Sequence, residues 1–235
     1  MSVTAFLIGT AAAAAAQSDY STKETRQLIR DYGDCIVNRQ QKRASEAILG
    51  DVGNAELMQR YSRLIDGYCL PTRPGIQIQA RFQGDQLQYA LADALVKKEL
   101  WNLPAPDFAQ IPSLYHRDPG PEPSRLGLNG KPLGARRYEA AVAAHQAAQA
   151  FRFLSLFGEC VVRAGPAAAR ALLLAEPGTP QEQAQFAALA TPFGICMPEG
   201  RTLAFGKVAL RGTIAINYYR LAKAAGVATT PGPAR

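Results

Sequence analysis

The sequence is poor in the residues from which most active sites and membrane spans are built. It has two histidines and four cysteines in 235 residues, with no C-x-x-C pair, so a zinc site would have few ligands. No phosphate-binding loop, dinucleotide-binding glycine motif, zinc-protease motif or serine-hydrolase motif occurs. No run of apolar residues reaches the roughly 20 that cross a bilayer. We therefore expect no metal, no cofactor, no transmembrane span and no catalytic residue that the sequence itself identifies.

The first sixteen residues indicate export. An apolar run over residues 3–16 ends in six consecutive alanines. It is too short for a membrane span, but it matches the apolar region and small-residue cleavage site of a secretory signal peptide, cut after Ala16. The alternative is an alanine-rich arm that is buried or disordered. The signal-peptide interpretation predicts a periplasmic or secreted protein.

Four short segments of the chain occur twice, in the same order. Their spacing stays between 125 and 128 residues. An internal repeat of this kind constrains the fold before any local pattern does. The matched pairs are GDCIV at 33–37 with GECVV at 158–162, CLP at 69–71 with CMP at 196–198, 76–78 with 203–205, and Gly84 with Gly212.

The repeat also places one pair of cysteines in each copy. Four cysteines allow three pairings. Pairing within a copy, Cys35 with Cys69 and Cys160 with Cys196, requires no contact between the copies, and we predict these two disulfides. Each would close a loop of about 35 residues, which corresponds to roughly 3.5–4 kcal/mol of stability in the chain-entropy model. Disulfides agree with an oxidising compartment.

Apolar residues at helical spacing predict a mainly α-helical fold. In the first copy, the apolar spacing predicts one helix through residues 28–36 and a second long helix from Asn54 to Ile65. A short helix is expected between them at 45–49. In the second copy, helices are expected from about Arg136, from Pro166, from Pro180 and over 207–225. Only residues 76–78 and 203–205 read as extended, and they predict at most a two-stranded ladder.

These patterns divide the chain into five parts. They are a signal peptide (1–16), helical repeat 1 (17–100), a connector with seven prolines (101–135), helical repeat 2 (136–225) and a disordered tail (226–235). The first half of the connector carries apolar residues and is expected to pack along the helices. We favour one domain in which the repeats pack about a pseudo-twofold axis. The alternative is two small disulfide-stapled domains on a tether.

The net charge of +7 is uneven along the chain. From Lys131 onward there are twelve basic and five acidic residues, whereas the mature part before it is neutral. An exported basic surface favours an anionic partner such as lipid headgroups, lipopolysaccharide or an acidic protein, and no nucleic-acid-binding motif is present. The alternative is a solvated face without a partner. The candidate surface lies on the last helix and comprises Lys207, Arg211, Tyr219, Arg220 and Lys223.

An acidic residue precedes the first cysteine of each copy. Asp34 and Glu159 would be able to act as an acid–base pair only if the fold brought them together. Glu159 lies four residues before Arg163, which favours a helical ion pair instead.

A resemblance to other proteins rests mainly on the second copy. The GECVV segment, Cys196-Met197-Pro198 and the stretches 210–215 and 218–220 resemble exported proteins of Gram-negative bacteria for which no activity is known. The resemblance implies export and a helical fold. We expect a periplasmic, non-catalytic binding or interaction protein that uses the groove between the copies or the basic helix. The alternative is a cell-envelope hydrolase with carboxylate chemistry.

Overall fold

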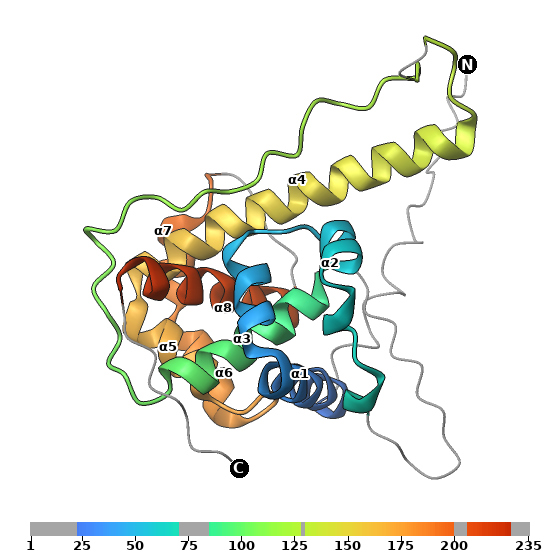
Figure 1. Cartoon of the computed structure of the whole chain (residues 1–235). Helices are drawn as coiled ribbons and strands as arrows, with labels where there is room; N and C mark the ends of the chain where they lie inside the picture. The colour runs from blue at the N-terminus through green and yellow to red at the C-terminus, as the bar shows by residue number, and fades with distance from the viewer. Residues whose placement is uncertain (1–22, 71–84, 128–129, 200–205, 227–235) are drawn as a thin grey trace, which may run out of the picture.

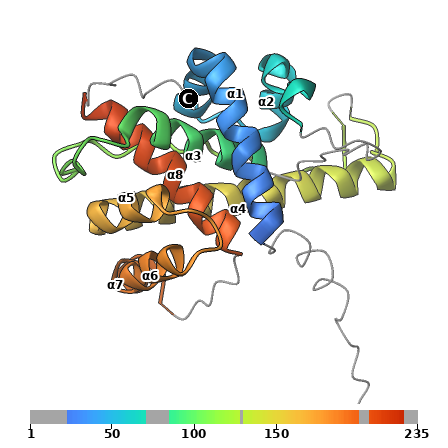
Figure 2. The same cartoon turned by 90° about the horizontal axis from the view of Figure 1, so that it is seen from below.

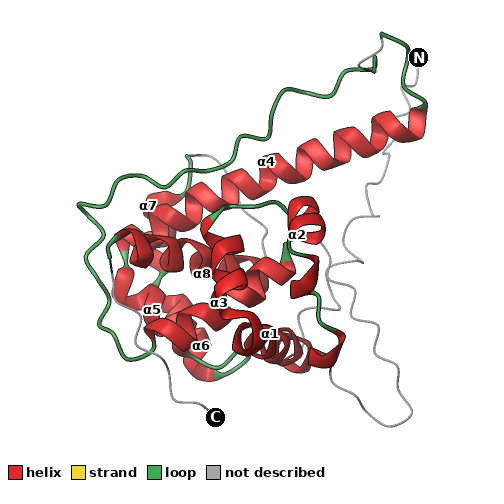
Figure 3. Cartoon of the chain, in the orientation of Figure 1, coloured by secondary structure: helices red, strands yellow, loops and turns green. Residues whose placement is uncertain are grey.

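The computed structural model of the protein describes residues 23–70, 85–127, 130–199 and 206–226, and this part of the chain is mainly α-helical. Figure 3 shows helices and loops but no strand in these residues. The predicted helical class is confirmed, whereas the predicted ladder (76–78 and 203–205) and residues 1–16 and 227–235 lie outside the described residues. The helices are α1 (Lys23–Leu49), α2 (Asn54–Arg60), η1 (Ser62–Leu64), η2 (Gly67–Cys69), α3 (Gln86–Leu100), α4 (Ala135–Ala164), α5 (Pro166–Leu174), α6 (Pro180–Ala188), α7 (Ala190–Cys196) and α8 (Lys207–Ala224).

Helix α8 lies at the centre of the molecule. Helix α3 packs between α1 and α8, and α4 and α5 pack against α8 from the other side (Figures 1 and 2). Every residue of α8 from 211 to 222 is buried. We call residues 23–100 the first half and residues 135–226 the second half. One continuous apolar core contains residues of both halves, among them Ile36, Leu91, Leu95, Val161, Leu172 and Ile214.

Two glycines allow the helices of each half to approach closely. A Cβ atom at Gly33 in α1 would lie 2.4 Å from the carbonyl oxygen of Ala90 in α3. A Cβ atom at Gly158 in α4 would lie 2.7 Å from Asn217 Nδ2 and 2.9 Å from Thr213 in α8. A larger residue would therefore push these helix pairs apart.

The first half departs from the predicted helices in two places. The helix expected at 45–49 is the end of α1, which has a non-helical residue at Gln40 (φ −140°, ψ 41°). The long helix expected from Asn54 to Ile65 ends at Arg60 and is followed by two short 3₁₀ turns. Met58 and Ile65 are exposed, so their helical spacing did not mark a core stripe.

The helix starts of the second half follow the predictions. Pro166 opens α5, and the Thr179 hydroxyl accepts a hydrogen bond from the backbone N–H of Glu182 at 3.2 Å to cap α6. The Glu182 carboxylate accepts a hydrogen bond from the N–H of Gly178 at 2.9 Å. It also accepts hydrogen bonds from Arg26 and Arg211. A break at Leu189 then separates α6 from α7.

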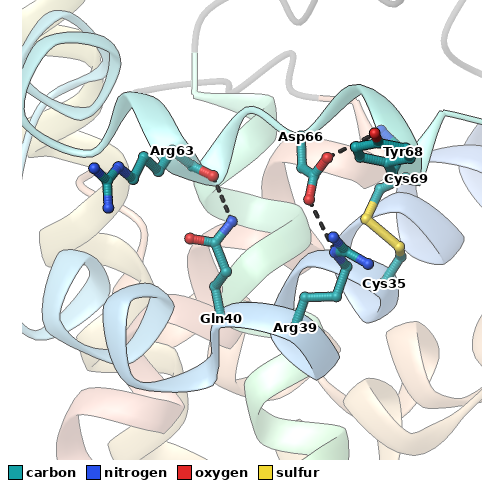
Figure 4. Close-up of a disulfide and its surroundings, with 7 residues drawn as sticks. All are labelled: Cys35, Arg39, Gln40, Arg63, Asp66, Tyr68 and Cys69. Carbon is teal, nitrogen blue, oxygen red and sulfur yellow. Dashed lines mark hydrogen bonds and ion pairs between the residues drawn. A yellow bond between two sulfur atoms is a disulfide. The ribbon is translucent and has the colours of Figure 1, made fainter.

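Both predicted disulfides are confirmed. The Cα atoms of Cys35 and Cys69 are 5.6 Å apart, and those of Cys160 and Cys196 are 5.7 Å apart. Figure 4 shows how the first bridge is flanked: the Arg39 guanidinium donates to the Asp66 carboxylate at 2.9 Å, and Asp66 accepts from the N–H of Tyr68 at 3.0 Å. The bridge therefore fixes the 3₁₀ segment on α1.

The proline-rich connector runs along the outside of α4 (Figure 1). It contains no helix in its described residues. Phe108 is its apolar anchor: the side chain is buried and its ring meets Tyr218 of α8 edge-on at 5.6 Å. The expectation that the apolar first half of the connector packs along the helices is confirmed for Leu103, Phe108, Ile111 and Leu114, whereas Trp101 and Tyr115 are exposed.

Candidate functional site: a cavity between the two halves

A small cavity of about 40 Å³, open to solvent on one side, lies between helices of the two halves. Helices α1 and α3 form one wall, and α8 and the loop before α6 form the other. Its wall is mostly apolar, and it includes three arginine side chains. The lining residues are Arg26, Ile29, Arg30, Tyr89, Ala90, Asp93, Pro177, Val208, Arg211 and Gly212.

Two of these arginines are fully engaged in a buried network. Arg26 contacts both oxygens of Glu182, with Nη1 at 2.8 Å from Oε2. Arg211 donates to Asp93 from Nε at 3.0 Å and reaches Glu182 from Nη1 at 3.2 Å. Burial raises the pKa of Glu182, but hydrogen bonds from Arg26 and Gly178 and the two positive charges outweigh it and lower the pKa overall. The network is therefore a set of permanent charges beside the cavity.

Arg30 is different because its guanidinium is only partly satisfied. The residue is 3% exposed. Nη1 donates to the carbonyl of Ala175 at 3.3 Å and to Glu176 at 2.6 Å, but Nε and Nη2 have no partner in the described part of the chain. Unmade hydrogen bonds of a buried, charged donor are costly. Arg30 is therefore the cavity-lining residue whose hydrogen bonds are incomplete.

Tyr89 lines the cavity as a neutral phenol. Burial, with a smaller contribution from the negative charge of Asp85, raises its pKa well above the usual value. The ring lies against α8, where a Cβ atom on Gly212 would come within 2.0 Å of Tyr89 Cγ. The neutral Tyr89 ring therefore contributes to the shape of the cavity wall and carries no charge there.

The predicted anionic-partner surface on the last helix is wrong for three of its five residues. Arg211, Tyr219 and Arg220 are buried, because α8 is the central helix and not a surface helix. Lys207 is exposed, and Lys223 is partly exposed and contacts Glu99 at 2.6 Å. Tyr218 and Tyr219 are both buried, although only one of this pair was expected in the core.

Ion pairs between the second half and the part of the chain before it use some of the basic residues that make the charge uneven. Basic residues of the second half contact acidic residues that precede it in the chain, and the first half donates to acids of the second. Charge surplus in one half is thus used for packing, which periodicity and counting do not reveal. The pairs are Arg211–Asp93, Arg220–Asp51, Lys223–Glu99, Arg152–Asp118, Arg26–Glu182 and Arg30–Glu176.

A second polar cluster holds the connector on α4. The Glu159 carboxylate accepts from the N–H of Leu114 at 3.1 Å, from His116 Nε2 at 2.5 Å and from Arg163 Nε at 2.8 Å. Arg163 also donates to three connector carbonyls, those of Phe108, Ile111 and Pro112. The predicted ion pair between Glu159 and Arg163 is confirmed. The part played by His116 was missed, because nothing in the sequence links it to a helix some forty residues later.

In this cluster Glu159 is held in its ionised form and Ser155 is held inside a helix. Burial raises the pKa of Glu159, but its hydrogen bonds from His116, Leu114 and Arg163 lower the pKa to about 2, so it cannot serve as a proton donor near neutral pH. His116 Nδ1 lies 2.8 Å from the hydroxyl of Ser155, yet Ser155 is buried within α4, where the helix uses the neighbouring backbone amides. Asp34 lies elsewhere and contacts Lys97 at 3.1 Å.

Comparisons with other proteins add no further constraint. No model of a known protein family, no curated protein and no solved structure matches the chain. No helix in the described residues has the length and apolar character that crossing a membrane requires. No group of three or more histidine, cysteine or acidic residues suited to a metal occurs there either.

Proposed function

We propose that this is an exported, non-catalytic binding protein in which two helical repeats hold a small ligand in the cavity between them. The observation that carries the proposal is Arg30, a buried guanidinium in the wall of a largely apolar cavity, whose Nε and Nη2 have no hydrogen-bond partner in the described residues. Ligand sites typically combine apolar walls with a few polar groups that fix orientation.

Matching backbone features support the proposed repeat. Gln40 in the first half and Gly165 in the second both interrupt helices, with φ −140° and −148°. They are 125 residues apart, the spacing of the GDCIV and GECVV segments, and the helices that follow end at Leu49 and Leu174 with the same spacing. A cavity between two such units lies where a pseudo-twofold arrangement would place a shared groove.

Two features support export to the periplasm or the medium. All four cysteines are in disulfides, which persist in oxidising compartments and are rare in the cytosol. The apolar segment 3–16 has the length and small-residue end of a signal peptide. Fusion of the chain to a reporter that is active only after export tests this part of the proposal.

The proposed ligand is a small carboxylate with a short apolar chain. Three arginines line the cavity and each has an acidic partner, Glu182 for Arg26, Asp93 for Arg211 and Glu176 for Arg30, but only Arg30 keeps two nitrogens without a hydrogen bond in the described residues. An incoming carboxylate would therefore be held by Arg30, whose planar donors suit a carboxylate. The apolar chain would contact Ile29 and Val208.

Titration of the full chain with hexanoate and with hexan-1-ol, followed by nuclear magnetic resonance, tests the cavity. We expect residues of α1, α3 and α8 to shift, and hexanoate to bind more tightly than the alcohol. Val208→Phe should block both ligands because it fills the cavity, whereas Val142→Phe, far along α4, should bind as the wild type does. Arg30→Met should reduce hexanoate affinity about tenfold, the loss of one charge-assisted hydrogen bond. If neither ligand perturbs the cavity helices, the proposed function fails.

A further inference from the structure

The N-terminal part of α4 extends beyond the other helices and forms an arm together with the connector (Figures 1 and 2). We define the arm as residues 123–127 and 130–150. No residue of the arm from 135 to 150 is buried, whereas burial begins at Phe151. At the tip, the N–H of Leu133 donates to the carbonyl of Arg125 at 2.8 Å and the N–H of Gly127 to that of Lys131 at 2.9 Å, which makes a tight hairpin.

The tip of the arm carries an excess of positive charge. Residues 122–139 include four basic residues, Arg125, Lys131, Arg136 and Arg137, and two acidic residues at the ends of the stretch, Glu122 and Glu139. All four are exposed. Several basic side chains elsewhere in the second half are paired with carboxylates, namely Arg152, Arg163, Arg211, Arg220 and Lys223. In the described residues, the three arginines of the arm tip form no ion pair with a carboxylate.

Two of these charges stand where they oppose helix stability. Arg136 and Arg137 occupy the first turn of α4, which has no acidic residue. A positive side chain at this end of a helix is unfavourable, because the helix dipole is positive there. Arg125 lies over the ring of Tyr138 at 4.6 Å and adds a third charge to the same place. An anionic partner would relieve this repulsion.

The arm tip also presents an apolar side chain to solvent. Leu126 is 55% exposed and lies in the hairpin next to Arg125. Basic residues with an adjacent apolar side chain suit the headgroup region of an anionic bilayer, where cations meet lipid phosphates and apolar groups reach the acyl boundary. A soluble polyanion would not require the exposed leucine.

We propose that the tip of this arm docks on a bilayer with anionic phospholipid headgroups, with the three arginines at the phosphates and Leu126 directed into the interface. This surface is separate from the cavity and does not depend on a ligand there. It also places the anionic partner on a different element from the last helix, whose arginines are buried.

Binding of the full chain to vesicles of phosphatidylcholine with and without phosphatidylglycerol tests the proposal. The readout is the ratio of the two affinities, because an apolar segment binds both vesicles alike. Each basic residue near an anionic surface contributes about fivefold, so reversal of Arg125, Arg136 and Arg137 to glutamate should lower the ratio at least about 100-fold. Leu126→Ser should lower the affinity for the anionic vesicles about threefold and leave the salt dependence unchanged.

A matched variant separates the arm from overall charge. Reversal of Lys42, Arg43 and Arg63, which are exposed on the first half, changes the net charge by the same amount and should lower the ratio less than threefold. Equal losses in both variants, or no preference of the wild type for anionic vesicles at low salt, would overturn the proposal. It would also be overturned if the arm variant kept vesicle binding but dissociated an oligomer of the wild type, which would make the arm a contact between copies of the chain.

Discussion

Glu159 is the single residue on which attachment of the connector most depends. Its carboxylate receives hydrogen bonds from Leu114, His116 and Arg163, and the residue is 6% exposed. Removing one partner of a buried charge pair leaves the other charge without compensation. The connector would then lose contacts that its own prolines cannot replace, because a proline nitrogen carries no hydrogen to donate.

The first prediction is that Glu159→Gln destabilises the protein by about 2–3 kcal/mol at pH 7. The amide keeps the shape of the side chain but leaves Arg163 and His116 without a negative partner. Urea unfolding monitored by circular dichroism gives the free energy directly. Glu56→Gln, which disrupts only the exposed pair with Arg60, should change the free energy of unfolding by less than about 0.5 kcal/mol.

The same residue makes stability depend on pH with a defined sign. Its pKa is about 2 in the folded protein, compared with 4.5 as the reference for an unpaired glutamate. The folded state therefore binds fewer protons, and the stabilisation is present above about pH 4.5 and is lost as the pH falls toward 2. The difference between the wild type and Glu159→Gln should accordingly shrink in this interval. A difference that stays constant from pH 7 to pH 2.5 would contradict the assigned role.

At the scale of elements, close approach of helices is set by glycines. A Cβ atom at Gly33 would lie 2.4 Å from the backbone oxygen of Ala90 in α3, and one at Gly158 would lie 2.9 Å from the backbone oxygen of Thr213 in α8. A backbone atom cannot move aside without displacing its whole helix, so the shorter contact at Gly33 is the stricter of the two. The equivalent placement of the two glycines is also what the proposed repeat requires.

We predict that Gly33→Ala and Gly158→Ala each destabilise the protein by about 1–3 kcal/mol, the usual cost of overpacking. Gly194, inside α7, provides the comparison, because a Cβ atom there meets nothing within 4 Å. Gly194→Ala should be neutral or should stabilise by up to about 1 kcal/mol through helix propensity. Chemical unfolding of the three variants decides the matter, and equal effects at all three glycines would refute the packing argument.

At the scale of the whole molecule, the two halves are joined by one core and by the ion pairs that cross between them. Arg26, Arg211 and Arg220 are all buried, and each contacts an acidic residue of the other half. Separation of the halves would expose apolar surface and leave buried charges without partners, and both consequences are costly. The halves should therefore not unfold independently.

At this scale we predict a single cooperative unfolding transition. Trp101 directly follows α3, the last helix of the first half, and reports local structure there, whereas far-ultraviolet circular dichroism reports all helices. The two signals should give the same midpoint in urea and the same free energy, as two-state behaviour requires. Two midpoints, with the tryptophan signal changing alone, would indicate two separately folding units.

The part of the candidate site that sequence reasoning located is its place between the halves. Spacing of apolar residues and helix-capping residues identified most helices, because these signals are local. The buried arginines of α8 were predicted to form a surface. The sequence of that helix places Arg211, Tyr219 and Arg220 among apolar residues, and this pattern does not reveal which face meets solvent. Arg30 was not singled out, since an arginine in an amphipathic helix usually reaches water.

The sequence by itself determined the helical class, the pairing of the four cysteines and most helix starts, because each depends on local spacing or on a segment that occurs twice. The tertiary structure decided which charges are buried, since Asp93 and Arg211 are distant in the chain and meet only when α3 packs on α8. It likewise decided that His116 binds α4 and that Arg30 lines a cavity. Such contacts arise from packing between helices, and the energy of a buried charge is set by neighbours that local sequence does not specify.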